Sequence, residues 1–319
     1  MPDAASEPSA IRSTVLANGE TRIDLDVSGL YIIPLTITMG VSRVRVDGIG
    51  GVETEEEHRG RGYARRVMEA AMTRMVAADS NVSTDPAALS FLFGIANFYE
   101  KFGYTPAAPW YELQLTELAD GASLPPGWIT RRCTPADLPA VRALYDQGVA
   151  HSVGAVIRHP SGRVWSTLAS AVADPARDEC RVVTCPNGEL AAYAWRGSDF
   201  WPVDDEEETP DALVIGEAIA NGPVPADALL TVCRARAVEE SARRPGVTKV
   251  QLSVSPDSPI YAAAMRQEAK LETFWTRSGG FMARTLHAGR LLAALAPELT
   301  RRLRAAGNTN VGMLQLVTD

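Results

Sequence analysis

The most informative segment of this 319-residue chain reads Gly51-Val52-Glu53-Thr54-Glu55-Glu56-Glu57-His58-Arg59-Gly60-Arg61-Gly62-Tyr63-Ala64. It predicts the end of a strand and then a loop, in which glycines alternate with arginines at the start of a helix. A helix start leaves backbone N–H groups without partners, and its dipole favours negative charge. Glycines let the backbone approach a ligand, and arginines add charge-assisted bonds to phosphate oxygens. The segment therefore predicts a binding site for a pyrophosphate.

The spacing of this loop separates it from other phosphate-binding loops. It is neither G-x-G-x-x-G after a first strand nor a P-loop ending in Gly-Lys-Ser/Thr, so dinucleotides and nucleoside triphosphates fit poorly. The plain alternative is an arginine–glycine turn that only starts a helix.

Two strands are expected before the loop. Apolar and polar residues alternate over 21–27, and the Asn18-Gly19 turn predicts a hairpin with the segment 11–17. A second alternation around Val44 and Val46 runs into the glycines of 48–51. Glycines inside a strand suggest a bulge or the close approach of a ligand or another backbone.

A helix and two further strands are expected after the loop. Apolar residues recur at helical spacing from Ala64 to Met75, which predicts one buried stripe. The nearly all-apolar run 88–95 is typical of a strand buried on both faces of a sheet. Asn97 is expected to cap a short helix that Gly103 ends, and the alternation at 111–115 predicts the last strand of a first domain.

The second half repeats this order of elements and predicts a duplicate domain. We expect a helix that starts at Thr134 and further helices near 164–172, 227–243 and 261, a hairpin over 181–196, strands near 213–218 and 249–254, and a last strand pair within 273–286. The predicted divisions are residues 1–119, a linker at 120–127, a second domain at 128–287, and a tail at 288–319 with one amphipathic helix and a strand near 311–317.

Arg59, Gly62 and Ala64 match the acetyl-coenzyme A motif Arg/Gln-x-x-Gly-x-Gly/Ala, so this region resembles the GNAT N-acetyltransferase superfamily. The longer pattern resembles the enhanced intracellular survival (Eis) family. It includes V-x-T, H-R-G-R-G, F-G, Y-E-K-F-G-Y, and the segment from Gly280 to Arg284. The resemblance implies an α/β fold with mixed sheets and tandem GNAT-like domains. The first would be catalytic and the second degenerate, followed by a segment resembling the start of a sterol-carrier-like domain. It also implies a homo-oligomer, possibly a hexamer by family likeness.

The resemblance also assigns roles to individual residues. Tyr99 would be the general acid that returns a proton to the departing thiolate, and a phenol pKa of about 10 suits this role. A packing tyrosine is the alternative. Asp319, at the chain end, would be the general base, with Glu53 acting through water as the alternative. The residues lining the pantetheine would be Val52, Glu53 and Thr54; those holding the pyrophosphate would be Arg59, Gly60, Arg61, Gly62, Tyr63, Ala64 and Arg65; those flanking the thioester would be Gly94 and Ile95.

Composition limits the partners. Hydrophobic residues make up 46% and charged residues 22%, a normal balance for a soluble protein, and the N-terminus does not resemble a secretory signal. A net charge of -8 argues against nucleic acid and favours cationic partners, and no apolar run is long enough for a membrane span. Four widely spaced cysteines fit reduced thiols in the cytoplasm (Cys133, Cys180, Cys185 and Cys233).

The sequence thus predicts an N-acetyltransferase that moves an acetyl group from acetyl-coenzyme A, without a metal, to a primary amine of a small cationic molecule. The acceptor would be aminoglycoside-like or another polyamine. Three alternatives stay open: an inactive coenzyme A-binding scaffold, acetylation of a protein lysine, and a lipid carrier.

Overall fold

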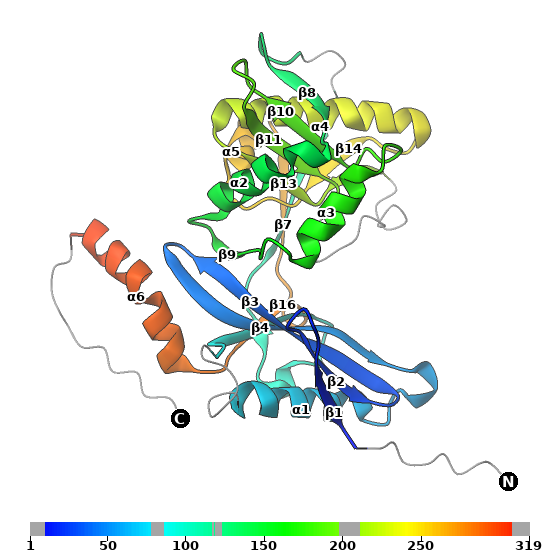
Figure 1. The fold of residues 1–319 in the computed structure, drawn as a ribbon, viewed down its shortest axis with the longest axis vertical. Coiled ribbons are helices and arrows are strands. Elements are labelled where there is room, and N and C mark those ends of the chain that lie inside the picture. The colour runs from blue at the N-terminus through cyan, green and yellow to red at the C-terminus, as the bar shows by residue number, and fades with distance from the viewer. Residues whose placement is uncertain (1–9, 78–85, 117, 119–122, 198–210, 308–319) are drawn as a thin grey trace.

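The computed structural model describes residues 10–77, 86–116, 118, 123–197 and 211–307. The chain forms two halves that lie one above the other along the long axis (Figure 1), and each half is built on mixed β-sheet. Within these ranges, no helix is long and apolar enough to cross a membrane. The expected α/β class with mixed sheets is confirmed.

The first half is built on one sheet in the order β1-β2-β3-β4-β5-β16-β6, with β9 paired to the free edge of β3. The predicted hairpin between the first two strands is confirmed, because β1 and β2 pair antiparallel around the Asn18-Gly19 turn. The strands of this sheet are β1 (Arg12–Val15), β2 (Thr21–Leu25), β3 (Ser28–Met39), β4 (Ser42–Thr54), β5 (Leu89–Gly94), β6 (Thr105–Pro106), β9 (Val153–Val156) and β16 (Gly280–Thr285).

Helices cover both faces of this sheet. On one face, α1 (Tyr63–Ala77) buries the predicted apolar stripe from Val67 to Met75 against β2, β3, β4 and β5. On the other face, α6 (Ala288–Ala305) packs Leu291 and Leu295 against the half of the sheet around Val44 and Phe91. The strand β5 is buried from both sides, as its apolar run predicted, because Phe91 and Leu92 belong to opposite clusters.

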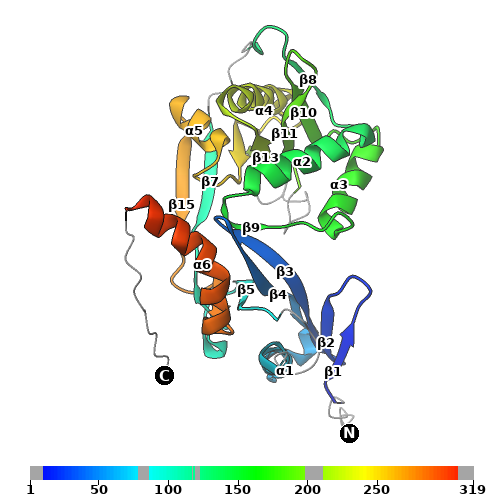
Figure 2. The same cartoon turned by 60° about the vertical axis from the view of Figure 1, so that its left-hand side comes forward.

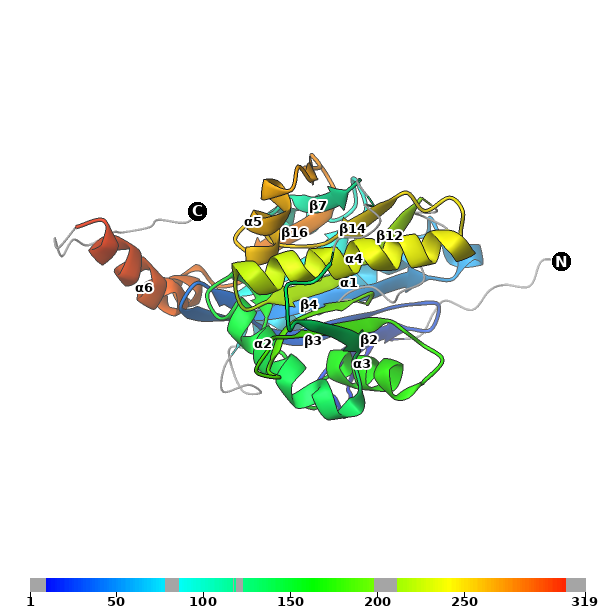
Figure 3. The same cartoon turned by 90° about the horizontal axis from the view of Figure 1, so that it is seen from above.

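The second half contains two four-stranded sheets, in the orders β13-β11-β10-β8 and β12-β14-β7-β15. A long helix, α4, lies across them (Figure 3) and fills the main core with α5. The strands are β7 (Trp110–Leu115), β8 (Ile129–Arg132), β10 (Cys180–Thr184), β11 (Leu190–Trp195), β12 (Ala212–Ile215), β13 (Glu217–Ala220), β14 (Lys249–Leu252) and β15 (Lys270–Phe274). The helices are α2 (Leu138–Val149), α3 (Arg163–Ala173), α4 (Pro223–Arg243) and α5 (Pro259–Arg266), and three short 3₁₀ turns are η1 (Glu56–His58), η2 (Glu100–Phe102) and η3 (Pro135–Asp137).

The two halves exchange a strand, which corrects two predictions. The strand β7 was expected to close the first sheet, but it pairs with β14 and β15 in the second half. Figure 2 shows β7 and β15 side by side there. The strands β15 and β16, expected as a pair, lie in different sheets, because β16 pairs with β5 and β6 of the first half.

Three smaller differences have local causes. Asn97 does not cap a helix: it has a φ of +60°, and the short turn η2 begins after Tyr99. The single strand expected near 213–218 is broken at Gly216 into β12 and β13. The strands β3, β6, β8 and β9 were not predicted. The expected strand near 311–317, Asp319 and residues 120–122 of the expected linker lie outside the described residues.

Candidate functional site: an open cradle beside splayed strands

The strands β4 and β5 separate where the thioester was expected. They pair in parallel over only three positions, which end at Gly48 and Phe91. Beyond that point β4 continues to Thr54 and β5 to Gly94, without further pairing between them. The sheet therefore opens at the carboxyl end of two parallel strands, a common position for ligands in α/β proteins.

A β-bulge bends β4 at this opening. Tyr31 lies opposite Gly50 and Gly29 lies opposite Glu53, so β4 holds one more residue than β3 between these pairs. Gly51 occupies the bulge with a φ of +58°, and a Cβ added there would lie 3.1 Å from the ring of Tyr31. The predicted role of the strand glycines is confirmed here: a bulge increases twist and turns the end of β4 away from β5.

The loop before α1 presents its backbone outward. Gly60 and Gly62 have φ values of +76° and +83°, and a Cβ added to either would meet no atom within 4 Å. The residues from Arg59 to Gly62 are exposed, so their own chain does not cover the loop. Among the described residues, no partner is recorded for the backbone N–H groups from Gly60 to Arg65. We refer to this segment, 59–65, as the cradle.

The arginines of the cradle differ in their contacts. Arg59 donates from Nε to the carbonyl of Thr54 at 3.2 Å, which ties the loop to the end of β4. Arg65 forms an ion pair with Glu69 at 2.7 Å on the exposed side of α1. Arg61 is exposed, and no ion pair to it is recorded within the described ranges. Arg61 is therefore the cradle arginine with the greatest freedom to reach a phosphate oxygen.

His58 supports the cradle from behind, a role that the sequence did not suggest. Its ring is mostly buried and meets the ring of Tyr63, the first residue of α1, edge-on at 6.0 Å between centroids. The contact packs the 3₁₀ turn η1 against the start of α1, so the loop between them has fixed ends.

The strand residues assigned to the pantetheine divide between the two faces of the sheet. Val52 packs toward α1, whereas the Glu53 carboxylate lies on the opposite face, 3.3 Å from Arg22. The hydroxyls of Thr54 and Ser28 are 2.9 Å apart, which joins the ends of β4 and β3. Glu53 is exposed and paired with a cation.

Tyr99 lies beside the end of β5. A Cβ added to Gly94 would lie 2.7 Å from Cδ2 of Tyr99, so the absence of a side chain at Gly94 makes room for this ring. The ring is buried with the α1 cluster, and no hydrogen bond from its hydroxyl is recorded to any residue that the structure describes. Ile95, the other residue assigned to the thioester, is 68% exposed.

Burial affects the two tyrosines of this region in the same direction. Loss of solvation raises the pKa of Tyr99 above its usual value, which keeps the phenol protonated at neutral pH. Burial also raises the pKa of Tyr104 to about 12. The Tyr104 hydroxyl is bonded to Ser90 at 2.6 Å inside the core, which fits a packing role for Tyr104.

A loop from the second half completes the surroundings of Tyr99. This loop, 275–279, connects β15 to β16, and a Cβ added to Gly279 would lie 2.8 Å from the carbonyl oxygen of Gly94. Ser278 accepts a bond from the N–H of Asn97 at 2.7 Å and donates one to Glu100. The segment carrying Tyr99 is thus held by residues that lie about 180 positions later in the sequence, and no local pattern could have predicted this contact.

The second half has the same strand–helix–strand order but no cradle. Its helix α4 begins directly at Pro223 after Gly222, and Pro225 is the third helical residue. Neither proline has an N–H, so the start of α4 offers few donors to an anion.

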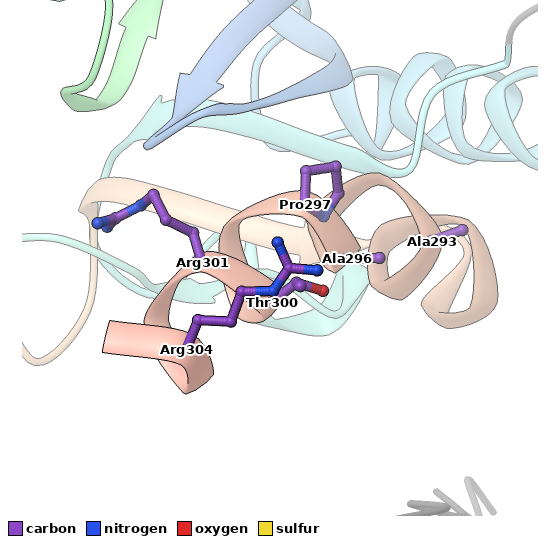
Figure 4. Close-up of a pocket in the computed structure, with 6 residues that line it drawn as sticks. All are labelled: Ala293, Ala296, Pro297, Thr300, Arg301 and Arg304. Atoms are coloured by element: carbon purple, nitrogen blue, oxygen red, sulfur yellow. The ribbon is translucent and has the colours of Figure 1, made fainter. Parts of the chain in front are cut away.

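Two surface hollows lie away from the cradle. One, of about 630 Å³, runs along the C-terminal half of α1 and includes Arg45, Asp47 and Arg74. The other lies on the outer side of α6 (Figure 4), and all of its lining comes from that one helix, so no second element encloses a ligand there. The cradle is an open surface, and its geometry comes from the backbone.

Comparison with known proteins supports the assignment of the first half. Residues 15–107 match the acetyltransferase (GNAT) domain family, which is less than a third of the chain but includes the cradle, β5 and Tyr99. No curated protein sequence matches the chain.

Solved structures resemble a larger part of the chain. A GCN5-related N-acetyltransferase from Anabaena variabilis has a TM-score of 0.60 at 17% identity, covering 88% of this chain and 66% of that one. A conserved protein from Enterococcus faecalis, described as a probable N-acyltransferase, has a TM-score of 0.59 at 15% identity, covering 86% and 64%. Eis1 from Mycobacterium abscessus has a TM-score of 0.50 at 17% identity, covering 86% and 66%.

These likenesses concern the fold, because identity is low and this chain spans 64% to 66% of the lengths of the three proteins. They extend beyond the region matched in sequence, into the second half. Residues 15–107 are therefore similar in sequence to the acetyltransferase (GNAT) domain, and the chain as a whole shares the fold of a GCN5-related N-acetyltransferase.

Proposed function

We propose that the chain is an N-acetyltransferase that uses acetyl-coenzyme A and acetylates a primary amine of a small molecule. One observation carries the proposal: the unpartnered N–H groups of the cradle stand at the start of α1, beside the opening between β4 and β5. A helix start with exposed glycine backbone suits a diphosphate. The adjacent opening suits a slender chain ending in a thioester.

Different groups around the opening would bind the diphosphate, polarise the thioester and supply the proton. The cradle N–H groups and Arg61 would hold the diphosphate, and Arg59 would keep the loop against β4. A backbone N–H on the part of β4 that no longer pairs with β5 would polarise the thioester carbonyl. Tyr99 would hold a proton for the departing thiolate, since its phenol stays protonated at neutral pH.

The acceptor base is a separate question. Asp319, assigned by family resemblance, lies outside the described residues. Glu53 is exposed and paired with Arg22, so it could act only through water. A neutral amine that loses its proton to solvent requires neither group. The small cationic acceptor, the homo-oligomer and the cytoplasmic location stay predictions.

The test is a titration followed by an assay. Calorimetry should detect binding of coenzyme A by the folded chain. Thiol release from acetyl-coenzyme A should then depend on an amine, in a panel of aminoglycosides, polyamines, lysine peptides and arylalkylamines. Uptake of coenzyme A without thiol release would favour the inactive scaffold, and absence of uptake would refute the proposal.

A further inference from the structure

Exposed aromatic side chains gather at one place on the molecule. Of the Phe, Tyr and Trp residues that the structure describes, only Trp110, Phe274 and Trp275 are exposed, at 39%, 47% and 60%. Such a concentration of exposed apolar surface usually marks a binding site.

These side chains continue into a row of rings that reaches the end of β5. Trp110 lies opposite Phe274 in the pairing of β7 with β15, and its ring centroid is 5.9 Å from that of Phe93 on β5. Phe93 in turn lies 5.5 Å from Phe281 on β16. We call Phe93, Trp110, Phe274, Trp275 and Phe281 the aromatic patch.

The patch residues that belong to the first sheet, Phe93 and Phe281, lie on the face opposite the cradle helix. Leu92 and Tyr99 pack on the face covered by α1. Phe91 and Phe281 pack on the other face, and Phe93 follows the same alternation along β5 as Phe91. A donor held at the start of α1 would therefore approach the opening from one face, which leaves the other face for the acceptor.

The patch is fixed next to the reacting position. The loop 275–279 begins at Trp275 and ends against the carbonyl of Gly94. Thr276 donates to the carbonyl of Gly279 at 2.8 Å, which closes the loop tightly on itself. Trp275 is therefore anchored at the base of a short, internally bonded loop beside the end of β5.

Four carboxylates near this face are already engaged. A polyamine needs carboxylates free to pair with its several charges, and each of these four has a partner in the structure. The pairs are Glu53 with Arg22, Glu100 with Ser278, Glu112 with Gln114, and Glu272 with Lys270.

We infer that the acceptor is a primary amine joined to a flat apolar ring, of the arylalkylamine class, and that Trp110 and Trp275 bind this ring. Aromatic faces stack on such rings with a geometry that linear polyamines cannot match. The inference rests on the proposed function and narrows its acceptor from amines in general to amines with an aromatic body.

The experiment uses the full chain with acetyl-coenzyme A and compares 2-phenylethylamine and tryptamine with putrescine and spermidine. We expect kcat/KM to be at least about tenfold higher for the arylalkylamines. Trp275→Ala and Trp110→Ala should each lower kcat/KM for arylalkylamines about tenfold, mainly through KM. Trp275→Phe should recover most of this loss, and coenzyme A affinity should not change.

Ile129→Ala is the matched control, because Ile129 is also exposed, at 59%, but lies on β8, in a different sheet from β7 and β15. This variant should keep wild-type kcat/KM. A preference for linear polyamines would overturn this inference without affecting the proposed function. Wild-type kcat/KM in both tryptophan variants would do the same. The inference would also fail if sedimentation showed that the wild type is a dimer and that Trp275→Ala dissociates it, because the patch would then be an interface between copies. Failure to take up coenzyme A would instead remove the proposed function.

Discussion

The substitution Gly62→Ala tests the cradle most directly. Gly62 has a φ of +83°, where an L residue costs about 1–2 kcal/mol of stability. A Cβ there meets no protein atom within 4 Å, so the side chain itself causes no clash in the free protein. It would instead occupy the space over the N–H groups of the cradle, where a diphosphate would lie.

The expected loss of affinity follows from the bonds that are displaced. A hydrogen bond to a charged group contributes about 1.5–3 kcal/mol. Losing one such bond corresponds to roughly 10- to 150-fold weaker binding of coenzyme A. Calorimetric titration measures this change, and urea unfolding of the same variant measures the cost in stability.

Gly188→Ala supplies the control. Gly188 has a φ of +86° in the turn between β10 and β11, and an added Cβ there also meets nothing within 4 Å. The two substitutions should therefore cost similar stability, while only Gly62→Ala weakens coenzyme A binding. If both variants bound coenzyme A as tightly as the wild type, the cradle would not be the diphosphate site.

Four further predictions concern the surroundings of the cradle and the second half. Tyr99→Phe should lower kcat by about 10²-fold or more with little change in coenzyme A affinity, whereas Tyr104→Phe should reduce stability and leave the kcat of the folded protein intact. Because burial raises the pKa of Tyr99, no alkaline loss of turnover from this group is expected until the pH exceeds about 10, as a pH–rate profile would show. Gly94→Ala should cost about 1–3 kcal/mol in urea unfolding and slow turnover, since its Cβ would overlap the Tyr99 ring; unchanged values would contradict that contact. The hydrogen bond from Arg131 lowers the pKa of Asp137 to about 2, so its stabilisation is present above pH ~4 and lost as the pH falls toward 2; Asp137→Asn should therefore destabilise by about 1–2 kcal/mol at pH 7, and unfolding curves should converge with the wild type in acid.

The first half was largely predictable because its signals are local. The stripe of α1, the doubly buried β5 and the bulge at Gly51 each follow from the spacing of a few residues. The position of the cradle at the start of α1 follows from the same local pattern. The strand β3 was missed although it is 12 residues long and Leu35, Ile37 and Met39 alternate with threonines, because the continuous apolar run 30–33 and Pro34 break the pattern.

The surroundings of the site were not predictable in this way. The neighbour of a strand depends on long-range pairing, which no window of sequence encodes. The sequence therefore predicted β7 and β16 as strands, but it did not predict that each pairs with strands of the other half. The same holds for the loop 275–279, whose serine and glycine carry no motif but contact Asn97 and Gly94.

The exchange explains why a half without a cradle belongs to the same functional unit. The strand β16 covers the edge of β5 that would otherwise leave Phe91, Phe93 and their backbone groups unpaired. The first half therefore cannot form its own site without residues that follow the whole second half in the sequence. Conversely, β7 lies between β14 and β15, so the second half depends on a strand that the first half supplies. The second half therefore supports the end of β5 without any need for a cradle of its own, because its chain continues into β16, which pairs with β5, and carries the loop 275–279, which lies against Gly94.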